Sequence, residues 1–299
     1  MASDADGGNE RAVEEGDIYR LVSPELLINL NAYRGVQLID ISNVDAPELI
    51  GGVRISGHPV ELYVDDNMVY VLMNDWRGYY GSRHAPEVEQ RQGGVVVAVD
   101  ITDRTAPRIV DQAHVPGRIQ TSRFIHGNGA AALYVVASGW NILETETGNG
   151  GPDTAVSVST DGATTVVKSF DVSNGELSAQ SMLDLGGYVS DIQATSEALM
   201  VARNSYYGND WEEEGYASRV SIVDITDPNG VMVEGAQALV LGNVESQFNM
   251  DIQGDVMRVV SGSRWGSTRT NYIQTFDITD INNVTEIARD EFGDNEDLY

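Results

Sequence analysis

Three observations predict an all-β fold made of repeated four-stranded antiparallel sheets. A mainly apolar phrase with an Asp at a fixed place occurs five times, and that Asp is Asp40, Asp100, Asp171, Asp224 and Asp277. The segments around each copy are short and rich in Val, Ile and Tyr, and Gly, Asn, Asp and Pro separate them, which is typical of strands and turns. No segment keeps the apolar period of an amphipathic helix. The chain is therefore expected to consist of strands alone.

Each repeat is expected to contain four strands, which we designate A to D. Strand A is half polar, strand B is apolar and ends near an aromatic residue, strand C ends at the repeated Asp, and strand D follows a turn. The segment VVVAVDI (95–101) is apolar on both alternating sets of side chains, so other sheets should cover both of its faces. Four-stranded sheets that pack face to face around an axis are the blades of a β-propeller.

The repeats predict an all-β propeller of four-stranded antiparallel blades, with five blades visible. An acidic, disordered tail is expected at residues 1–16. The predicted blades and the start of a further strand follow at residues 17–57, 58–117, 118–186, 187–243, 244–293 and 294–299. The five blades form either a compact ring or a fragment of a larger propeller.

The repeated Asp residues are expected to shape turns. Asp and Thr side chains accept hydrogen bonds from backbone N–H groups one or two residues further along the chain. We therefore expect each repeated Asp to end strand C and to cap the turn to strand D, and Asp103 and Asp227 to act in the same way inside these turns. The alternative is a ring of carboxylates with a chemical role.

The segment DIYRLVSPELLINLNAYRGVQLIDISN (17–43), the segment TSRFIHGNGAAALYVVAS (121–138) and the repeated VDITD turns resemble the β-propeller domain of secreted bacterial and archaeal proteins. The turns are also similar to the short propeller repeats of the LVIVD type. The resemblance covers about residues 17–299. It implies an extracellular or cell-surface propeller without an established catalytic site. Family members are expected to be longer, with a signal sequence before this region and further blades after it.

Composition excludes several classes of function. The chain has 46 acidic and 18 basic residues, a net charge of −28, so its field repels nucleic acid and anionic membranes. It has no Cys, which excludes disulfides and thiolate chemistry, and no apolar run long enough for membrane insertion. No GxSxG, Walker or dinucleotide-binding motif is present.

The connections between strands B and C carry almost all the length variation, and in an up-and-down blade they leave from one face. Residues 77–93, 141–163 and 204–217 should therefore form a loop-rich rim, and long loops on a rigid scaffold often carry binding sites. Trp, Tyr and Arg are common at interface hot spots. The candidate binding residues of this rim are Tyr33, Arg34, Trp76, Arg77, Tyr79, Tyr80, Arg83, Trp140, Tyr206, Tyr207, Trp211, Arg264 and Trp265. The alternative is that the Trp side chains fill gaps between blades.

We therefore predict a non-catalytic extracellular binding or scaffolding module that presents its aromatic rim to a protein or glycan, with no cofactor. One alternative is a polysaccharide hydrolase or lyase, because strand A would line the axis and two carboxylates there could form an acid–base pair. Its polar axial residues are Glu61, Ser122, Arg123, Ser190, Asp191, Gln193, Gln247, Asn249 and Asp251. The other alternative is a Ca²⁺-stabilised module that uses the acidic clusters at 65–66, 212–214 and 290–297, or Asp4, Asp6 and Glu15.

Overall fold

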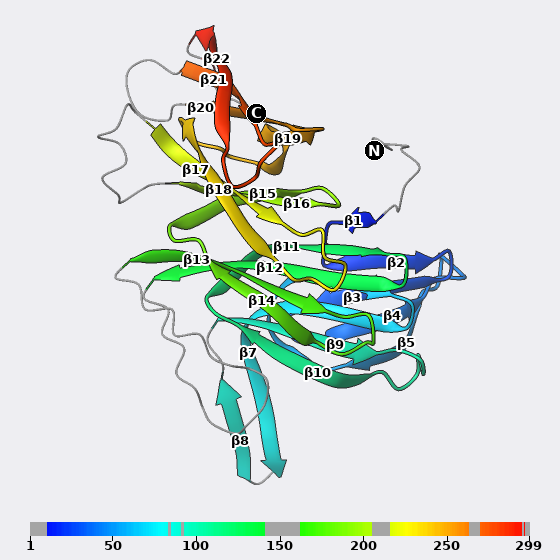
Figure 1. Cartoon of the computed structure of the whole chain (residues 1–299). Helices are drawn as coiled ribbons and strands as arrows, with labels where there is room; N and C mark the ends of the chain where they lie inside the picture. Colours follow the sequence, from blue (N-terminus) through cyan, green and yellow to red (C-terminus); the bar gives the residue numbers. More distant parts are fainter. Residues whose placement is uncertain are drawn as a thin grey trace.

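Five antiparallel sheets follow one another along the chain (Figure 1). The computed structural model describes residues 11–82, 85–90, 93–140, 162–204, 216–262, 270–294 and 296. Each sheet contains one meander of four consecutive strands, and β1 (Ala12–Glu14) and β8 (Ala85–Gln90) are added strands in two of the sheets, so the predicted all-β fold of four-stranded antiparallel sheets is confirmed. Within the described residues, no helix is long and apolar enough to cross a membrane.

The first two blades span the N-terminal third of the chain. The strands of blade 1 are β2 (Tyr19–Ser23), β3 (Leu26–Asn31), β4 (Gly35–Asp40) and β5 (Glu48–Val53). The strands of blade 2 are β6 (Ser56–Asp65), β7 (Met68–Ser82), β9 (Gly94–Asp100) and β10 (Arg108–Val115). The extra strand β8 (Ala85–Gln90) pairs with the end of β7, so part of the expected 77–93 loop is a β-hairpin, which projects from the lower edge of the molecule in Figure 1.

Three further blades follow. The strands of blade 3 are β11 (Arg118–Gly127), β12 (Ala130–Trp140), β13 (Ala163–Asp171) and β14 (Ser178–Asp184). Those of blade 4 are β15 (Tyr188–Ala194), β16 (Ala198–Asn204), β17 (Tyr216–Asp224) and β18 (Val233–Leu241). Blade 5 follows the 3-10 turn η2 (Gln247–Asn249) and contains β19 (Met250–Gln253), β20 (Val256–Gly262), β21 (Thr270–Asp277) and β22 (Thr285–Asp294).

The core lies between the blades. Four hydrophobic clusters join blade 1 to 2, blade 2 to 3, blade 3 to 4, and blade 4 to 5. Strand β9 shows why its sequence has no polar face: Val95, Val97 and Val99 pack toward blade 1, while Val96 and Ala98 pack toward blade 3. Burial of both faces removes apolar surface from water at about 25 cal/mol per Å². The sheets are thus held by blade-to-blade packing.

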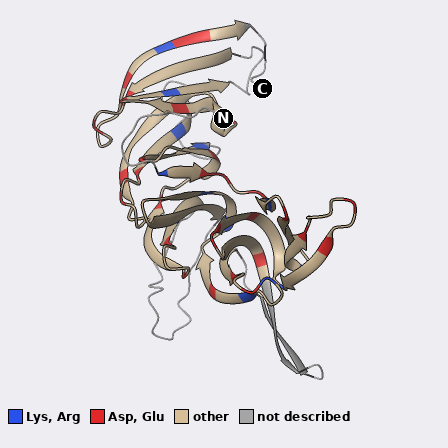
Figure 2. Ribbon diagram, turned by 90° about the vertical axis from the view of Figure 1, so that its right-hand side faces the viewer, with Lys and Arg blue, Asp and Glu red and all other residues tan. Residues whose placement is uncertain are grey.

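The described part of the chain forms an open arc. No core cluster of described residues joins blade 1 to blade 5, and blade 5 lies at the upper end in Figures 1 and 2. The outer face of each terminal blade carries exposed apolar side chains, including Leu21 and Leu49 in blade 1 and Ile273 and Ile287 in blade 5. Acidic residues are spread along the whole described ribbon in Figure 2.

The repeated Asp residues cap turns. The carboxylates of Asp40, Asp100, Asp224 and Asp277 each accept a hydrogen bond of 2.8–2.9 Å from the backbone N–H two residues further on. Asp171 does the same at 2.9 Å with the N–H of Ser173. These bonds hold the pKa of Asp40, Asp100 and Asp277 below the ordinary value. The residues therefore act as turn formers in five equivalent places.

The N-terminal segment departs from the prediction. Residues 1–10 lie outside the described part of the chain, but residues 11–16 are not a disordered tail, because β1 (Ala12–Glu14) pairs with β11 as a fifth strand of blade 3. Strand order in that sheet is β1-β11-β12-β13-β14, so β1 lies on the inner edge. The expected further strand at 294–299 falls almost entirely outside the described residues.

Candidate functional site

The first meander strands of blades 2, 3 and 4 share a bulge that places polar side chains at one level. The register against the second strand shifts immediately before Glu61 in β6, Thr121 in β11 and Asp191 in β15. A bulge inserts one extra residue and changes the direction in which the following side chains point. Glu61, Thr121 and Asp191 therefore occupy equivalent positions in neighbouring blades, a relationship that no residue pattern in the strand A segments indicates.

Arg123 of β11 connects blades through its hydrogen bonds, and its side chain is 3% exposed. One terminal nitrogen donates to the Thr121 hydroxyl at 3.2 Å and to the Ser122 carbonyl oxygen at 2.7 Å. The other donates to the Ile192 carbonyl oxygen at 2.9 Å and to the side-chain oxygen of Gln247. One residue of blade 3 thus binds the first strand of blade 4 and the 3-10 turn that leads into blade 5. The Nε–H of Arg123 has no hydrogen-bond partner.

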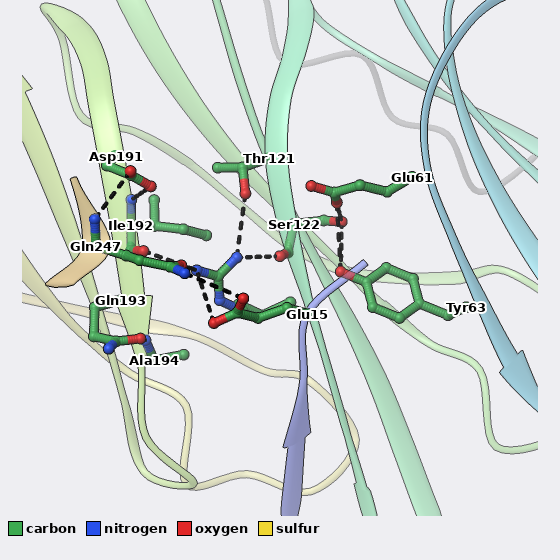
Figure 3. Close-up of polar contacts among 11 residues, drawn as sticks. Glu15, Glu61, Tyr63, Thr121, Ser122, Asp191, Ile192, Gln193, Ala194 and Gln247 are labelled. Carbon is green, nitrogen blue, oxygen red and sulfur yellow. Dashed lines mark hydrogen bonds and ion pairs between the residues drawn. The ribbon is translucent and has the colours of Figure 1, made fainter. Parts of the chain in front are cut away.

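Glu61 lies in β6 of blade 2. Its carboxylate accepts hydrogen bonds from the Ser122 hydroxyl and, at 3.4 Å, from the Tyr63 hydroxyl, while the oxygens of Tyr63 and Ser122 are 2.9 Å apart. Burial raises the pKa of Glu61, although these hydrogen bonds and the charge of Arg123 act in the opposite direction. Burial also raises the pKa of Tyr63. The three side chains form a compact polar contact between blades 2 and 3 (Figure 3).

Asp191 lies in β15 of blade 4. Its carboxylate accepts hydrogen bonds from two backbone N–H groups, that of Ile192 at 2.7 Å and that of Gln247 at 3.0 Å. Burial is the main cause that raises its pKa. Because both carboxylate oxygens are bound to backbone, Asp191 fixes the connection into blade 5.

The remaining predicted axial residues do not join this cluster. Ser190 donates to the Ala202 carbonyl oxygen at 3.2 Å, and Gln193 accepts a 3.0 Å hydrogen bond from the N–H of Ala194. Asn249 accepts a 2.9 Å hydrogen bond from the N–H of Ser246, and Asp251 forms an exposed ion pair with Arg258. These side chains form hydrogen bonds with nearby backbone groups or, for Asp251, an ion pair at the surface. The predicted axial residues therefore divide into a central cluster and residues that lie outside it.

A segment that we call the inner strap, residues 11–18, lies against this cluster. The Glu15 carboxylate lies 3.9 Å from the Arg123 guanidinium and accepts a 3.1 Å hydrogen bond from the side-chain nitrogen of Gln247. Gly16 lies so close to Glu61 that an added Cβ would be 2.5 Å from the Glu61 Cβ. The backbone N–H of Leu62 donates to the Asp17 carbonyl oxygen at 2.7 Å.

A second charged cluster holds the middle of the inner strap. The Glu14 carboxylate lies 3.0 Å from Nε2 of His126 in β11 and 2.6 Å from the guanidinium of Arg20 in β2. The carboxyl of Asp65 in β6 has a raised pKa, caused first by burial and partly offset by the nearby His126. Blades 1, 2 and 3 therefore all contribute titratable groups around Glu14.

The carboxylates of Glu61 and Asp191 accept hydrogen bonds from groups of the protein itself. Glu61 accepts two hydroxyl hydrogen bonds on one carboxylate oxygen, and each carboxylate oxygen of Asp191 accepts one backbone hydrogen bond. Among the residues described, no group of three or more His, Asp or Glu side chains has an arrangement that could hold a metal ion.

The candidate rim residues fall into three groups. Tyr33 and Arg34 are exposed in the turn between β3 and β4, and the exposed fraction of Tyr33 is 82%. Trp76, in contrast, is 6% exposed and belongs to the core cluster between blades 1 and 2, so its assignment to an exposed rim is wrong and the gap-filling alternative holds for it. The side chains of Arg77, Tyr79, Tyr80, Arg83, Trp140, Tyr206, Tyr207, Trp211, Arg264 and Trp265 lie outside the described part of the structure.

The Tyr33–Arg34 turn is built by its neighbours. The side-chain oxygen of Asn31 accepts hydrogen bonds from the N–H of Tyr33 at 3.0 Å and the N–H of Arg34 at 3.2 Å. Gly35 has a φ of +72°, and an added Cβ would lie 2.3 Å from the Val53 carbonyl oxygen, so only glycine fits. The aromatic and cationic side chains therefore project from a turn with a fixed backbone.

Comparison with known proteins agrees with this architecture. No curated protein matches the chain. A chain in a solved structure of S. cerevisiae Dbp5 L327V bound to Nup159, Gle1 H337R, IP6 and ADP is 10% identical, with a TM-score of 0.36, a likeness too low to carry an argument. The match covers 88% of this chain and spans 58% of that chain's length. The family model of the β-propeller domain matches residues 9–299, and the chain belongs to this family.

Proposed function

We propose that this propeller is a non-catalytic, extracellular binding or scaffolding module that presents its B–C rim to a protein or glycan. The observation that carries the proposal is the contrast between two sets of side chains. The axial carboxylates are bound within the protein, whereas Tyr33 is 82% exposed beside Arg34 on a turn that Asn31 and Gly35 fix. The extracellular location follows from the resemblance to propeller domains of secreted proteins.

The physical chemistry of this turn suits recognition. A Tyr ring buries a large area on binding, retains a polar hydroxyl, and loses little conformational entropy because it has two rotatable angles. Arg adds a planar set of donors that match carboxylates, and both residue types are enriched among hot spots. A turn that is already ordered avoids part of the entropy cost of binding.

The β7–β8 hairpin supports the same face. It extends the connection between the second and third strands of blade 2, which is the equivalent of the Tyr33 turn in blade 1. Equivalent connections of neighbouring blades leave from the same end of their sheets. The hairpin and the turn therefore provide two extensions of the scaffold for one ligand.

Binding screens with matched variants test the proposal. The full chain is screened against an array of glycans and purified surface proteins, and any ligand is measured again with the variant Tyr33→Ala/Arg34→Ala. The control is Val44→Ala, which removes an 80% exposed side chain from the β4–β5 turn at the other end of blade 1. We expect at least a tenfold loss of affinity for the rim variant and none for the control. Equal affinity of both variants would show that the ligand binds elsewhere.

A further inference from the structure

The inner strap contacts all five blades within eight residues. Arg11 donates to the carbonyl oxygens of Ser196 at 3.1 Å and Ile225 at 2.7 Å in blade 4. Residues 12–14 pair with blade 3, and Glu15 accepts from Gln247 at the entry to blade 5. The carbonyl oxygen of Asp17 binds the N–H of Leu62 in blade 2, and that of Ile18 binds the N–H of Leu30 in blade 1 at 2.8 Å.

The strap is held in a way that differs from the core strands. Its described side chains are half-buried or exposed, and Glu15 is 56% exposed. Val13 is its one residue packed against a core cluster, whereas the central strands of each blade are nearly inaccessible to solvent. Backbone hydrogen bonds and charge pairs therefore provide most of its attachment. A segment with little apolar burial opens at a lower free-energy cost than the core.

The contacts also define a chemical preference along the strap. A cation at position 11 reaches carbonyl oxygens at the base of blade 4, and the two acidic residues at positions 14 and 15 meet His126, Arg20, Arg123 and Gln247. Position 16 accepts only glycine, because a Cβ there would collide with that of Glu61. These requirements resemble those of a groove that recognises an extended peptide by strand addition, in which backbone bonds give affinity and side-chain pockets give specificity.

We propose that the inner edge of blade 3 is a binding groove for an extended acidic peptide and that residues 11–18 occupy it in cis. The second observation that supports a recognition site is Arg123, a buried cation with an unpartnered Nε–H, whose guanidinium lies 3.9 Å from the Glu15 carboxylate of the strap. The groove accepts a peptide with a cation three residues before two consecutive carboxylates, followed by glycine. The strap, linked to blade 1, acts as an intramolecular competitor at high effective concentration.

Displacement of the strap in the full chain tests the proposal. Gly16→Ala introduces a Cβ 2.5 Å from the Glu61 Cβ, while the control Gly162→Ala introduces one with no atom within 4 Å. The probe is a fluorescein-labelled synthetic peptide RAVEEGDI, the sequence of residues 11–18, measured by fluorescence anisotropy. We expect the Gly16→Ala chain to bind it at least tenfold more tightly than the wild type or the Gly162→Ala chain. The peptide RAVQQGDI should bind less tightly, because it lacks both carboxylates.

Amide hydrogen exchange at Leu30 and Leu62, whose N–H groups bind the strap, shows whether it has been released. If exchange accelerates in Gly16→Ala but the peptide does not bind better, or if RAVQQGDI binds equally well, the proposal is wrong. A second variant, Arg11→Ala/Glu14→Gln/Glu15→Gln, removes the side-chain contacts without a steric clash. If neither variant releases the strap, residues 11–18 are a permanent strand and the groove is not a ligand site, which would also overturn the proposal.

Discussion

The side-chain amide of Asn74 pairs with the backbone of Ile119 through two buried hydrogen bonds. Its nitrogen donates to the Ile119 carbonyl oxygen at 2.9 Å, and its oxygen accepts from the Ile119 N–H at 2.8 Å. Asn74 lies in β7 of blade 2, and Ile119 is the second residue of β11 in blade 3. A side chain thus continues the hydrogen-bond pattern of a sheet across the boundary between two blades.

Polar side chains connect the later blades at comparable places. The Ser138 hydroxyl in β12 accepts a hydrogen bond from the N–H of Val189 at 3.3 Å, and the Ser218 hydroxyl in β17 accepts one from the N–H of Val244 at 3.2 Å. Each of these bonds holds the connection that leads into the next blade. Apolar packing brings neighbouring sheets together, and these bonds fix where the next innermost strand begins.

Substitution of Asn74 measures the strength of this connection. Asn74→Ala removes both bonds and leaves the buried N–H and C=O of Ile119 without those partners, so we expect a loss of roughly 2–4 kcal/mol in the free energy of unfolding. Chemical denaturation followed by circular dichroism provides the measurement. The control is Asn29→Ala, because Asn29 is half-buried and donates one long hydrogen bond of 3.4 Å to Gln37. A similar loss for both variants would contradict a specific role of Asn74.

The two aromatic residues with contrasting burial give a second prediction. Trp76→Ala removes a large side chain from the core between blades 1 and 2, with an expected loss of roughly 3–5 kcal/mol. Tyr33→Ala removes an 82% exposed ring and should change stability by no more than about 0.5 kcal/mol. Thermal denaturation compares the two variants. A stable Trp76→Ala chain would mean that Trp76 is not part of the core.

The raised pKa of Glu61 determines in which direction the stability of the folded chain changes with pH. Burial raises its pKa in the folded chain above the ordinary value of 4.5, so the folded chain holds this proton more tightly than the unfolded chain. Its contribution to stability is therefore full below the unfolded-state pKa and is lost as pH rises through the folded-state pKa. The variant Glu61→Gln cannot ionise at this position, so it does not lose this stability as pH rises.

We expect the melting temperature of Glu61→Gln to exceed that of the wild type most at neutral pH, with a difference that shrinks as pH falls toward about 4.5, the ordinary value, and levels off below it. Melting curves between pH 4 and pH 8 supply the measurement. The control Glu25→Gln changes an exposed carboxylate in the turn between β2 and β3. A difference that is constant across this pH range would refute the sign derived for Glu61.

The capping role of the repeated Asp residues can be separated from their charge. Asp100 accepts a 2.8 Å hydrogen bond from the N–H of Thr102 and forms an exposed ion pair with Arg108. Asp100→Asn keeps an oxygen acceptor for the turn, whereas Asp100→Ala removes it. We therefore expect a lower melting temperature for the Ala variant than for the Asn variant. Equal melting temperatures for the two variants, both below that of the wild type, would show that charge, and not the turn, is what this position provides.

The lowered pKa of Asp100 also predicts how the stability difference between the wild type and the Ala variant changes at low pH. Hydrogen bonds with Thr102 are the largest cause of the shift, so the folded chain favours the ionised carboxylate. The stability that this provides is present above the unfolded-state pKa and is lost as pH falls through the folded-state pKa. The difference between the wild type and Asp100→Ala should therefore narrow below about pH 3.8, the ordinary value.

The sequence predicts the blades because the signals that specify them are local. Strand β9 is apolar on both faces because blades cover both faces, and the Asp-containing turns satisfy backbone groups two residues away. Because each blade is a meander of consecutive strands, blades that follow one another in the sequence are neighbours in the structure. These features require no information from distant parts of the chain.

The inner strap could not be predicted in this way. Ala12 pairs with His126, a partner more than a hundred residues away, and its neighbours are as acidic and polar as those of a disordered segment. The burial of Trp76 has a similar origin, because an aromatic residue at the end of a strand suits either a core or a rim. The equivalence of Glu61, Thr121 and Asp191 depends on bulges, which appear only when strands are paired.

Amide hydrogen exchange at Leu62 in the wild-type chain tests most directly that residues 11–18 line the inner edges of the blades. The N–H of Leu62 donates to the Asp17 carbonyl oxygen at 2.7 Å, so we expect slow exchange at Leu62 and, with it, at Leu30. Exchange of both amides at the rate of unprotected groups would contradict it.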